Sequence, residues 1–297
     1  MRQGFFTDTT VCIGCKACEV ACKEWNAVPQ DGDLTLSGMS FDNTKHLGAS
    51  TWRHVAFVEQ PKPFGTRDVA FPDLSAGLSA AAAGGHAGLD VLSMAGGAGP
   101  DGQVARPDFR WLMASDVCKH CTEAACLDVC PTGALLRTEF GTVVVQNDIC
   151  NGCGYCVSAC PFGVIARRED DGRAFKCTLC YDRISHDLTP ACAKACPTES
   201  IQFGELDELR DRAAARVEAL HAAGVTDARL YGEDPGDGVG GFGAFFLLLD
   251  EPEVYGLPPD PVATTRDLPD MWRHAALAAV GLLAGLVSVF AGRRGRR

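Results

Sequence analysis

The sequence lacks an excess of basic residues. Its 27 lysines and arginines are outnumbered by 38 aspartates and glutamates, which gives a formal net charge of −11. Because binding to nucleic-acid phosphates requires an excess of positive charge, we expect no nucleic-acid partner and expect proteins as partners instead. The 297 residues are 46% hydrophobic and 22% charged, which excludes an intrinsically disordered or collagen-like protein.

The sequence also lacks the features of a secretory signal peptide and of a catalytic site. The first ten residues, MRQGFFTDTT, contain no apolar segment and no small-residue cleavage site, so we expect no signal peptide on this chain. The sequence shows no combination of acid, base and nucleophile that would support bond chemistry. We therefore expect a protein that is not itself catalytic.

Long hydrophobic runs are absent until the C-terminal end. There, residues 275–292 carry no charge and are followed by the sequence RRGRR. As a helix this segment would be about 27 Å long, close to the roughly 30 Å hydrocarbon core of a bilayer. Trp272 and the flanking arginines favour membrane interfaces, so we expect a transmembrane helix over 272–293; a buried core helix is the alternative.

The charges around this helix predict its orientation. Four arginines follow it, whereas one arginine, Asp267 and Asp270 precede it. By the positive-inside rule, the basic tail 294–297 lies in the cytoplasm, and the rest of the protein lies on the extracytoplasmic side of the cytoplasmic membrane. Within the helix, Gly281 and Gly285 form a G-x3-G step that would let a helix of a membrane partner approach closely.

No cysteine stands alone in the sequence. All sixteen fall into four groups of four, and three of the groups end in Cys-Pro. The first and third groups read C-x2-C-x2-C-x3-C, the run of bacterial iron–sulfur ferredoxins, in which three closely spaced thiolates bind one cubane and the fourth reaches its neighbour. The groups are Cys12, Cys15, Cys18, Cys22; Cys118, Cys121, Cys126, Cys130; Cys150, Cys153, Cys156, Cys160; and Cys177, Cys180, Cys192, Cys196.

Sixteen thiolates account for four [4Fe–4S] clusters without remainder, so we expect four such clusters as cofactors. Two alternatives use the same residues. A disulfide framework suits small secreted proteins, but cysteines in closely spaced triplets are poor disulfide partners. Zinc sites are normally built from two C-x2-C pairs separated by a longer loop, so a zinc-stabilised interaction scaffold is the alternative from a different class.

Charged residues lie beside the cysteines. Four lysines are placed where a cation would raise the reduction potential of a cluster by favouring its more negative reduced form; ordinary surface lysines are the alternative. We expect His120 and His186 to bond to the backbone, because cysteines already fill the ligand positions of their runs. The four lysines are Lys16, Lys119, Lys176 and Lys194.

The sequence after the last cysteine group predicts a packing helix and a strand. Five apolar residues recur at helical spacing, acidic residues occupy the first turn, and Gly224 provides a stop signal. The apolar sequence AFFLLLD then predicts a strand, which indicates an appended α+β element over 205–268. The residues on the apolar stripe are Leu206, Leu209, Ala213, Val217 and Leu220.

The order of the cysteine groups resembles that of the four-cluster electron-transfer subunits of molybdenum or tungsten enzymes in the dimethyl-sulfoxide-reductase superfamily. Within it, the protein is similar to the beta subunits of membrane-bound respiratory formate dehydrogenases. The resemblance covers nearly the whole sequence except about 75–102. Related nitrate reductase subunits have a tryptophan in the third run and a three-iron cluster, and Cys153 argues against them. The similar segments are CIGCKACEVACKEWN, TWRHVAFVEQ, FKCTLCYDRI, PACAKACPTESIQFG, VYGLPPDP and the C-terminal hydrophobic helix.

This resemblance implies an α+β fold of two fused dicluster ferredoxin-like modules with irregular loops, plus the C-terminal transmembrane helix. Residues 1–30 and 165–204 would form the first module and 105–165 the second, while 31–104 would be an insertion with a strand and an Ala/Gly-rich loop. The implied ligand sets are Cys12, Cys15, Cys18 and Cys196 for cluster A; Cys177, Cys180, Cys192 and Cys22 for cluster B; Cys118, Cys121, Cys126 and Cys160 for cluster C; and Cys150, Cys153, Cys156 and Cys130 for cluster D.

The resemblance also implies a function. The subunit would pass electrons from a molybdopterin-containing catalytic alpha subunit, holding molybdenum or tungsten, to a membrane cytochrome b gamma subunit and quinone. It would cross the membrane folded, attached to a partner with a twin-arginine signal, and would then be held to the bilayer by its own helix. The alternative is an electron-transfer subunit of a dimethyl-sulfoxide- or polysulfide-type reductase, with electrons running from quinol to the catalytic subunit.

Overall fold

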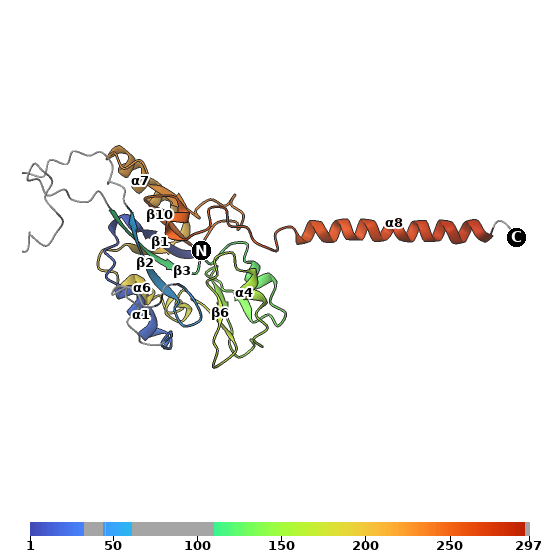
Figure 1. Cartoon of the computed structure of the whole chain (residues 1–297), viewed down its shortest axis with the longest axis horizontal. Helices are drawn as coiled ribbons and strands as arrows, with labels where there is room; N and C mark the ends of the chain where they lie inside the picture. The colour runs from blue at the N-terminus through green and yellow to red at the C-terminus, as the bar shows by residue number, and fades with distance from the viewer. Residues whose placement is uncertain (33–43, 45, 61–109, 295–297) are drawn as a thin grey trace, which may run out of the picture.

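A four-stranded sheet forms the centre of the protein. The structure is a computed structural model that describes residues 1–32, 44, 46–60 and 110–294, so most of the expected insertion, including its Ala/Gly-rich loop, lies outside the described residues. The order of the strands in the sheet is β8-β1-β10-β9; Figure 1 labels its neighbouring strands β1 and β10. These strands are β1 (Gln3–Asp8), β8 (Ile201–Glu205), β9 (Arg229–Tyr231) and β10 (Ala244–Leu248).

The strand pairing in this sheet joins the two ends of the cysteine-bearing region. β1 runs antiparallel to β8, with Thr7 opposite Ile201, and parallel to β10. The end of β1, which leads into Cys12, therefore lies beside the start of β8, which follows Cys196. The segment expected as an appended α+β element supplies β9 and β10 to this same sheet, so it is built into the core.

Three antiparallel ladders lead into the other three cysteine groups. The last residue of β3 precedes Cys118, and β5 and β7 lead into Cys150 and Cys177. The strand expected within TWRHVAFVEQ is present as β2. The ladders are β2 (Arg53–Gln60) with β3 (Arg110–Val117), β4 (Leu135–Arg137) with β5 (Val143–Val145), and β6 (Ala166–Arg167) with β7 (Ala174–Phe175).

Most helices in the described part of the protein are short and lie within the cysteine groups. The exception before the C-terminal end is α7 (Leu206–Ala222), whose predicted apolar stripe is confirmed: four of its five residues are buried, and Val217 is half-buried. Gly224 follows it with φ +86°, as a helix stop requires. The short helices are α1 (Ala17–Trp25), α3 (Ala125–Asp128), α4 (Tyr155–Ala159), α5 (Tyr181–Ile184), α6 (Ala191–Lys194) and the 3-10 turns η1 (Thr9–Val11) and η3 (Pro252–Tyr255).

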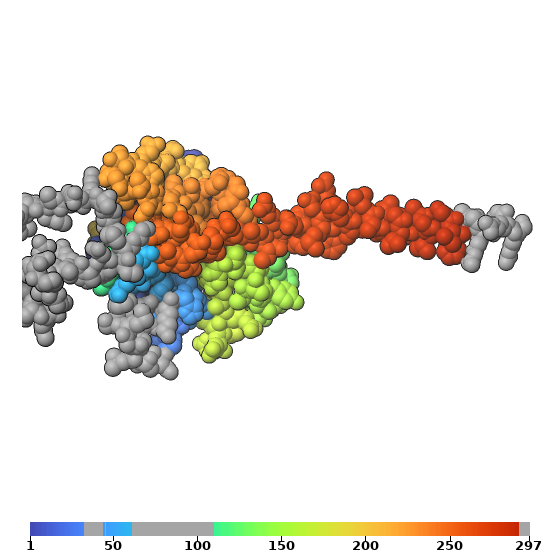
Figure 2. Space-filling model, turned by 45° about the horizontal axis from the view of Figure 1, so that its top comes forward, coloured from blue at the N-terminus to red at the C-terminus, as the bar shows by residue number. Residues whose placement is uncertain are grey.

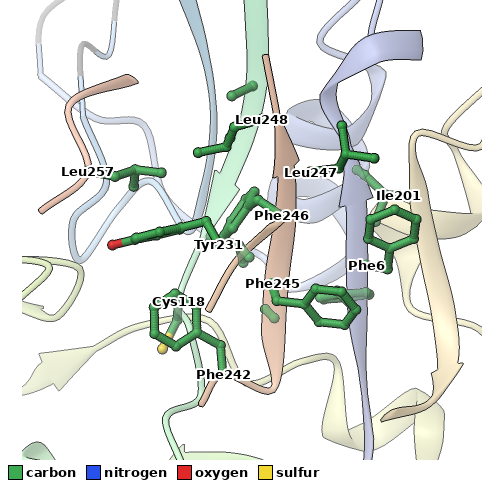
Figure 3. Packing of buried hydrophobic residues seen from close by; sticks show 14 of the residues in the cluster. Phe6, Cys118, Ile201, Tyr231, Phe242, Phe245, Phe246, Leu247, Leu248 and Leu257 are labelled. Atoms are coloured by element: carbon green, nitrogen blue, oxygen red, sulfur yellow. The ribbon is translucent and has the colours of Figure 1, made fainter. Parts of the chain in front are cut away.

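Aromatic side chains fill the core on both faces of β10. The predicted strand is confirmed, and all five of its residues are buried. Phe245 stacks on Phe6 with ring centroids 5.3 Å apart, while Tyr231 meets Phe242 edge to face at 5.2 Å (Figure 3). Burial of each large apolar side chain stabilises the fold by about 1.5–3 kcal/mol. Cys118 belongs to the same cluster, so the core continues up to the second cysteine group.

The C-terminal helix α8 (Leu268–Arg294) projects away from the rest of the protein (Figure 1). Its segment Leu268–Phe290 is long and apolar enough to cross a membrane, and none of it is buried against the protein. It is thus a candidate membrane-spanning helix, consistent with the helix expected over 272–293 and with a membrane-anchored subunit.

The root of α8 is attached to the second and third cysteine groups. Thr265 Oγ1 donates a 2.6 Å hydrogen bond to Asp128 in α3, and Thr264 Oγ1 donates one of 3.4 Å to the carbonyl of Ala159 in α4. Figure 2 shows the start of α8 beside the green segment that carries these groups. The helix therefore leaves the protein next to one pair of cysteine groups.

Candidate functional site

All four cysteine groups begin with the same backbone turn. The residue before the second cysteine of each group has a positive φ: Gly14 (65°), His120 (46°), Gly152 (74°) and Leu179 (58°). A Cβ on Gly14 would lie 2.5 Å from Met113 Sδ, so only glycine fits there. His120 and Leu179 hold a conformation that costs an L-residue about 1–2 kcal/mol. The tight turn brings the thiols of each run to one side of the backbone.

Two pockets are lined by four cysteines each. Cys12, Cys15, Cys18 and Cys196 line one, together with Ser115. Cys118, Cys121, Cys126 and Cys160 line the other, with Lys119 and Lys176 in its wall. In both, three cysteines come from one run and the fourth comes from a different run. These are the sets expected for clusters A and C.

The thiols of the other two sets also influence one another. Burial raises the pKa of Cys22, and Cys177, Cys192 and Cys180 raise it further. Burial raises the pKa of Cys156 to about 11, with contributions from Cys150, Cys153 and Cys130. Asn26 Nδ2 lies 3.8 Å from Cys22 Sγ and 3.9 Å from Cys180 Sγ, so these two thiols of different runs are neighbours. The structure therefore brings together the residues expected for clusters B and D.

Neighbouring sets approach each other in one order. Besides burial, the pKa of Cys18 in set A is raised by Cys192 of set B. Burial and then Cys118 of set C raise the pKa of Cys177 in set B to about 12. The pKa of Cys126 in set C is raised by burial and also by Cys156 of set D. These couplings link set A to set B, set B to set C and set C to set D, and we refer to this order as the row.

The two sets at the ends of this row are partly exposed to solvent, and one inner set is buried. Cys15 of set A and Cys153 of set D are exposed, whereas all four cysteines of set B are buried. Exposed apolar residues lie close to these two cysteines in the sequence: Ile13 and Val20 near Cys15, and Ile149 and Tyr155 near Cys153. Each end of the row therefore reaches a surface suited to contact with another protein.

The cysteines fit iron–sulfur clusters better than disulfides or single metal ions. All sixteen are free thiols. In the described part of the protein, no three His, Cys, Asp or Glu side chains lie close enough to hold one metal ion. A single zinc would need its sulfurs about 3.8 Å apart, given bonds of about 2.3 Å. The four thiolates that bind a cubane lie farther apart than those that bind one zinc ion. Burial favours the protonated thiol, and binding to iron would convert it to a thiolate.

Two of the four lysines beside the cysteines are buried cations. Lys119 is paired with Asp116 and lies 4.8 Å from the centre of the Phe246 ring. Lys176 donates to the carbonyls of Val143 and Cys177 and has no carboxylate partner among the described residues. The surface-lysine alternative is wrong for both of them. It is right for Lys194, which is exposed, while Lys16 is half-buried and pairs with Glu19.

Both histidines bond to the backbone, as expected. His120 Nδ1 accepts a hydrogen bond of 3.0 Å from the amide of Val143, so its proton lies on Nε2, which is buried and has no hydrogen-bond partner among the described residues. Burial and the nearby Lys176 lower the pKa of His120 well below its ordinary value, which keeps the ring neutral. His186 Nδ1 lies 2.8 Å from the carbonyl of Asp182 on the surface.

Sequence reasoning missed Arg53. It is only 2% exposed, and its Nη1 donates to the carbonyl and Oγ of Ser115 at 3.2 and 3.0 Å. Burial alone would lower the pKa of Arg53, but the thiols of Cys192 and Cys18, among others, outweigh it and raise the pKa. Its only signal in the sequence is an arginine at the start of a strand whose middle, Val55–Val58, is apolar.

Comparisons with known proteins agree with the cysteine chemistry. A family model described as "4Fe-4S dicluster domain" matches residues 109–206, and one described as "4Fe-4S binding domain" matches residues 9–25. The protein therefore contains 4Fe-4S ferredoxin-like domains.

Relatives match along most of the sequence. The formate dehydrogenase iron-sulfur subunit of Haemophilus influenzae is 36% identical over 93% of this chain and 76% of the relative. The nitrate-inducible formate dehydrogenase iron-sulfur subunit of Escherichia coli K12 is 34% identical over 96% and 81%. One polypeptide of the anaerobic dimethyl sulfoxide reductase of the same organism is 31% identical, and the match covers 71% of this chain and 77% of that relative.

Exposure of Cys15 and Cys153 predicts the order in which iron is lost. When the purified protein is treated with ferricyanide and EDTA, iron held by the sets of these two residues leaves first, because solvent and chelator reach their sulfurs. Iron held by Cys22, Cys177, Cys180 and Cys192 leaves last. Iron analysis and electron paramagnetic resonance (EPR) of timed samples measure this, and simultaneous loss from all sets would contradict it.

Proposed function

Because this protein belongs to the family of formate dehydrogenase iron–sulfur subunits, we propose that it carries four [4Fe–4S] clusters and passes electrons from a molybdopterin-containing catalytic subunit to a membrane cytochrome b subunit and quinone. Electron transfer by 4Fe-4S clusters is the function of the subunit, and the oxidation itself takes place in another subunit. The observation that carries the proposal is identity of 34–36% over more than nine tenths of the sequence.

The proposed ligand sets follow the grouping of the thiols. Clusters A and C would be held by the cysteines that line the two pockets, with the fourth ligand from a distant run in each case. Clusters B and D would be held by the sets of Cys22 and Cys130. Two dicluster modules then result, one from the first and fourth runs and one from the second and third.

The order of the sets suggests the path of the electron through the subunit. When bound, the clusters supply one-electron chemistry, and the protein sets their positions, burial and surrounding charge. The partners would dock at the exposed, apolar-rimmed ends near Cys15 and Cys153. Because α8 is rooted on α3 and α4, the end near Cys153 would face the membrane subunit and the end near Cys15 the catalytic subunit.

The reductase alternative receives less support. The dimethyl sulfoxide reductase polypeptide matches 71% of this chain, against 93–96% for the formate dehydrogenase subunits, and at lower identity. The shorter match leaves a larger part of the sequence without a counterpart. Formate is therefore the preferred electron source.

Reduction by formate tests the proposed direction. In the complex purified with its native partners, we expect formate to bleach the broad visible absorbance and to produce the EPR signals of reduced clusters. Iron and acid-labile sulfide would be counted in the same sample. Clusters that are reduced by a quinol but not by formate would contradict the proposal, and a colourless protein that contains zinc would exclude the iron–sulfur chemistry.

Cys22 tests the exchange of ligands between runs. We expect Cys22→Ser to abolish the same EPR signal as Cys177→Ser, although Cys22 belongs to the first run, because both would hold cluster B. Cys12→Ser is the matched control and is expected to affect the signal of cluster A instead. If Cys22→Ser and Cys12→Ser altered the same cluster while Cys177→Ser altered another, the proposed sets would be wrong.

We also propose that the cluster-bearing part lies outside the cytoplasmic membrane. The arginines at the end of α8 and the acidic residues at its start support a cytoplasmic C-terminus. Protease added to spheroplasts is expected to digest the cluster-bearing part and to leave a short fragment that contains α8, detected by a C-terminal tag. Protection of the whole protein until the membrane is permeabilised would reverse the orientation.

A further inference from the structure

Arg53 occupies an unusual position at the end of the β2–β3 ribbon. It lies opposite Val117, the residue before Cys118, and its guanidinium lies 5.0 Å from the centre of the Phe5 ring. Its Nη1 donates to Ser115 Oγ, which lies 3.2 Å from Cys18 Sγ. Arg53, Ser115 and Cys18 thus form a continuous polar contact inside the protein, where each residue is buried.

The positive charge of Arg53 is not balanced by a carboxylate of the described residues. Within the described residues it forms no ion pair with a carboxylate, and its Nε and Nη2 are buried without a hydrogen-bond partner. A buried cation without an anion is strongly destabilising, because its hydration is lost and nothing replaces it. Cysteines of two sets can supply negative charge near the guanidinium. Cys18 of set A shares Ser115 Oγ with it, and Cys22, Cys177 and Cys192 of set B raise its pKa.

We propose that Arg53 is a positioning residue that serves as the shared counter-charge of clusters A and B and raises the reduction potential of both. The inference rests on the proposed four-cluster function. Reduction adds one electron, supplied by formate oxidation, to a cluster that is already negative. A fixed cation beside it stabilises that added charge. No proton moves, since a guanidinium stays protonated.

A single cation between two clusters also acts on their interaction. Without it, an electron on cluster A would repel an electron on cluster B through a medium of low dielectric constant. Arg53 offsets part of this repulsion, because it stabilises added negative charge on either cluster, and this supports transfer along the row. Lys119 is less suited to this role, because its charge is already paired with Asp116.

The test is a redox titration of the complete complex followed by EPR. In Arg53→Met, we expect the reduced-to-oxidised ratio of clusters A and B at a fixed potential to fall by tenfold or more, which corresponds to about 59 mV for one electron. Clusters C and D are expected to change less. Arg53→Lys retains the charge and is expected to restore most of the wild-type ratio, which a purely structural role would not predict.

Arg110 provides a matched control. It is buried to a similar degree in the same ribbon, about 24 Å away at the end opposite Arg53, but its charge is paired with Asp250. Arg110→Met is therefore expected to lower the thermal stability of the protein without changing any cluster potential. If Arg53→Met fails to retain its clusters, Arg53→Gln, which keeps a donor for Ser115 but not the charge, takes its place.

The outcomes separate this inference from the proposed function. Absence of iron and acid-labile sulfide from the wild-type complex would overturn the proposed function. Four intact clusters with unchanged potentials of A and B in the uncharged variants would overturn the role of Arg53 alone. An equal fall in Arg53→Lys and Arg53→Met would also overturn it, because the effect would then not follow the charge.

Discussion

The antiparallel pairing of β1 with β8 is the contact on which the arrangement of the cysteines depends. It joins the start of the sequence to the segment after the last cysteine group, and Thr7 lies opposite Ile201. As a result, Cys12 and Cys196 line the same pocket although they are far apart in the sequence. The pairing is held by an aromatic core in which Phe6 stacks on Phe245 of the neighbouring strand β10. A slip of one residue would turn these side chains to the wrong face and separate the two runs.

Positive charge inside an acidic protein is the second notable feature. The protein has a net charge of −11, yet Arg53, Lys119 and Lys176 are almost completely buried beside the cysteines. Burying a cation costs several kcal/mol unless an anion or hydrogen bonds compensate for it. Lys119 has a carboxylate and Lys176 has two carbonyls. Arg53 has Ser115, and thiols of sets A and B raise its pKa. The interior is therefore suited to hold negatively charged clusters, although the protein as a whole is acidic.

Local features of the sequence could be predicted because they depend on short spacings. The helix α7 with its apolar stripe, the buried strand β10 and the C-terminal apolar helix are all present as expected. The iron–sulfur chemistry followed from cysteine spacing, and the family models agree. The burial of Lys119 and Lys176 was not decided by the sequence, since a lysine next to a cysteine can point into the protein or into solvent. The burial of Arg53 could not be predicted from its place at the start of a strand, because its neighbours come from three other parts of the sequence.

By itself, the sequence determined which residues carry the chemistry, since the C-x2-C spacing that brings three thiols to one turn is a property of a few consecutive residues. Only the tertiary structure shows which cysteines of different runs line one pocket, as Cys12 and Cys196 do, and that Arg53, Lys119 and Lys176 are buried. The physical reason is that these relations depend on strand pairing and core packing between residues far apart in the sequence, as between Thr7 and Ile201. No local pattern encodes such pairing.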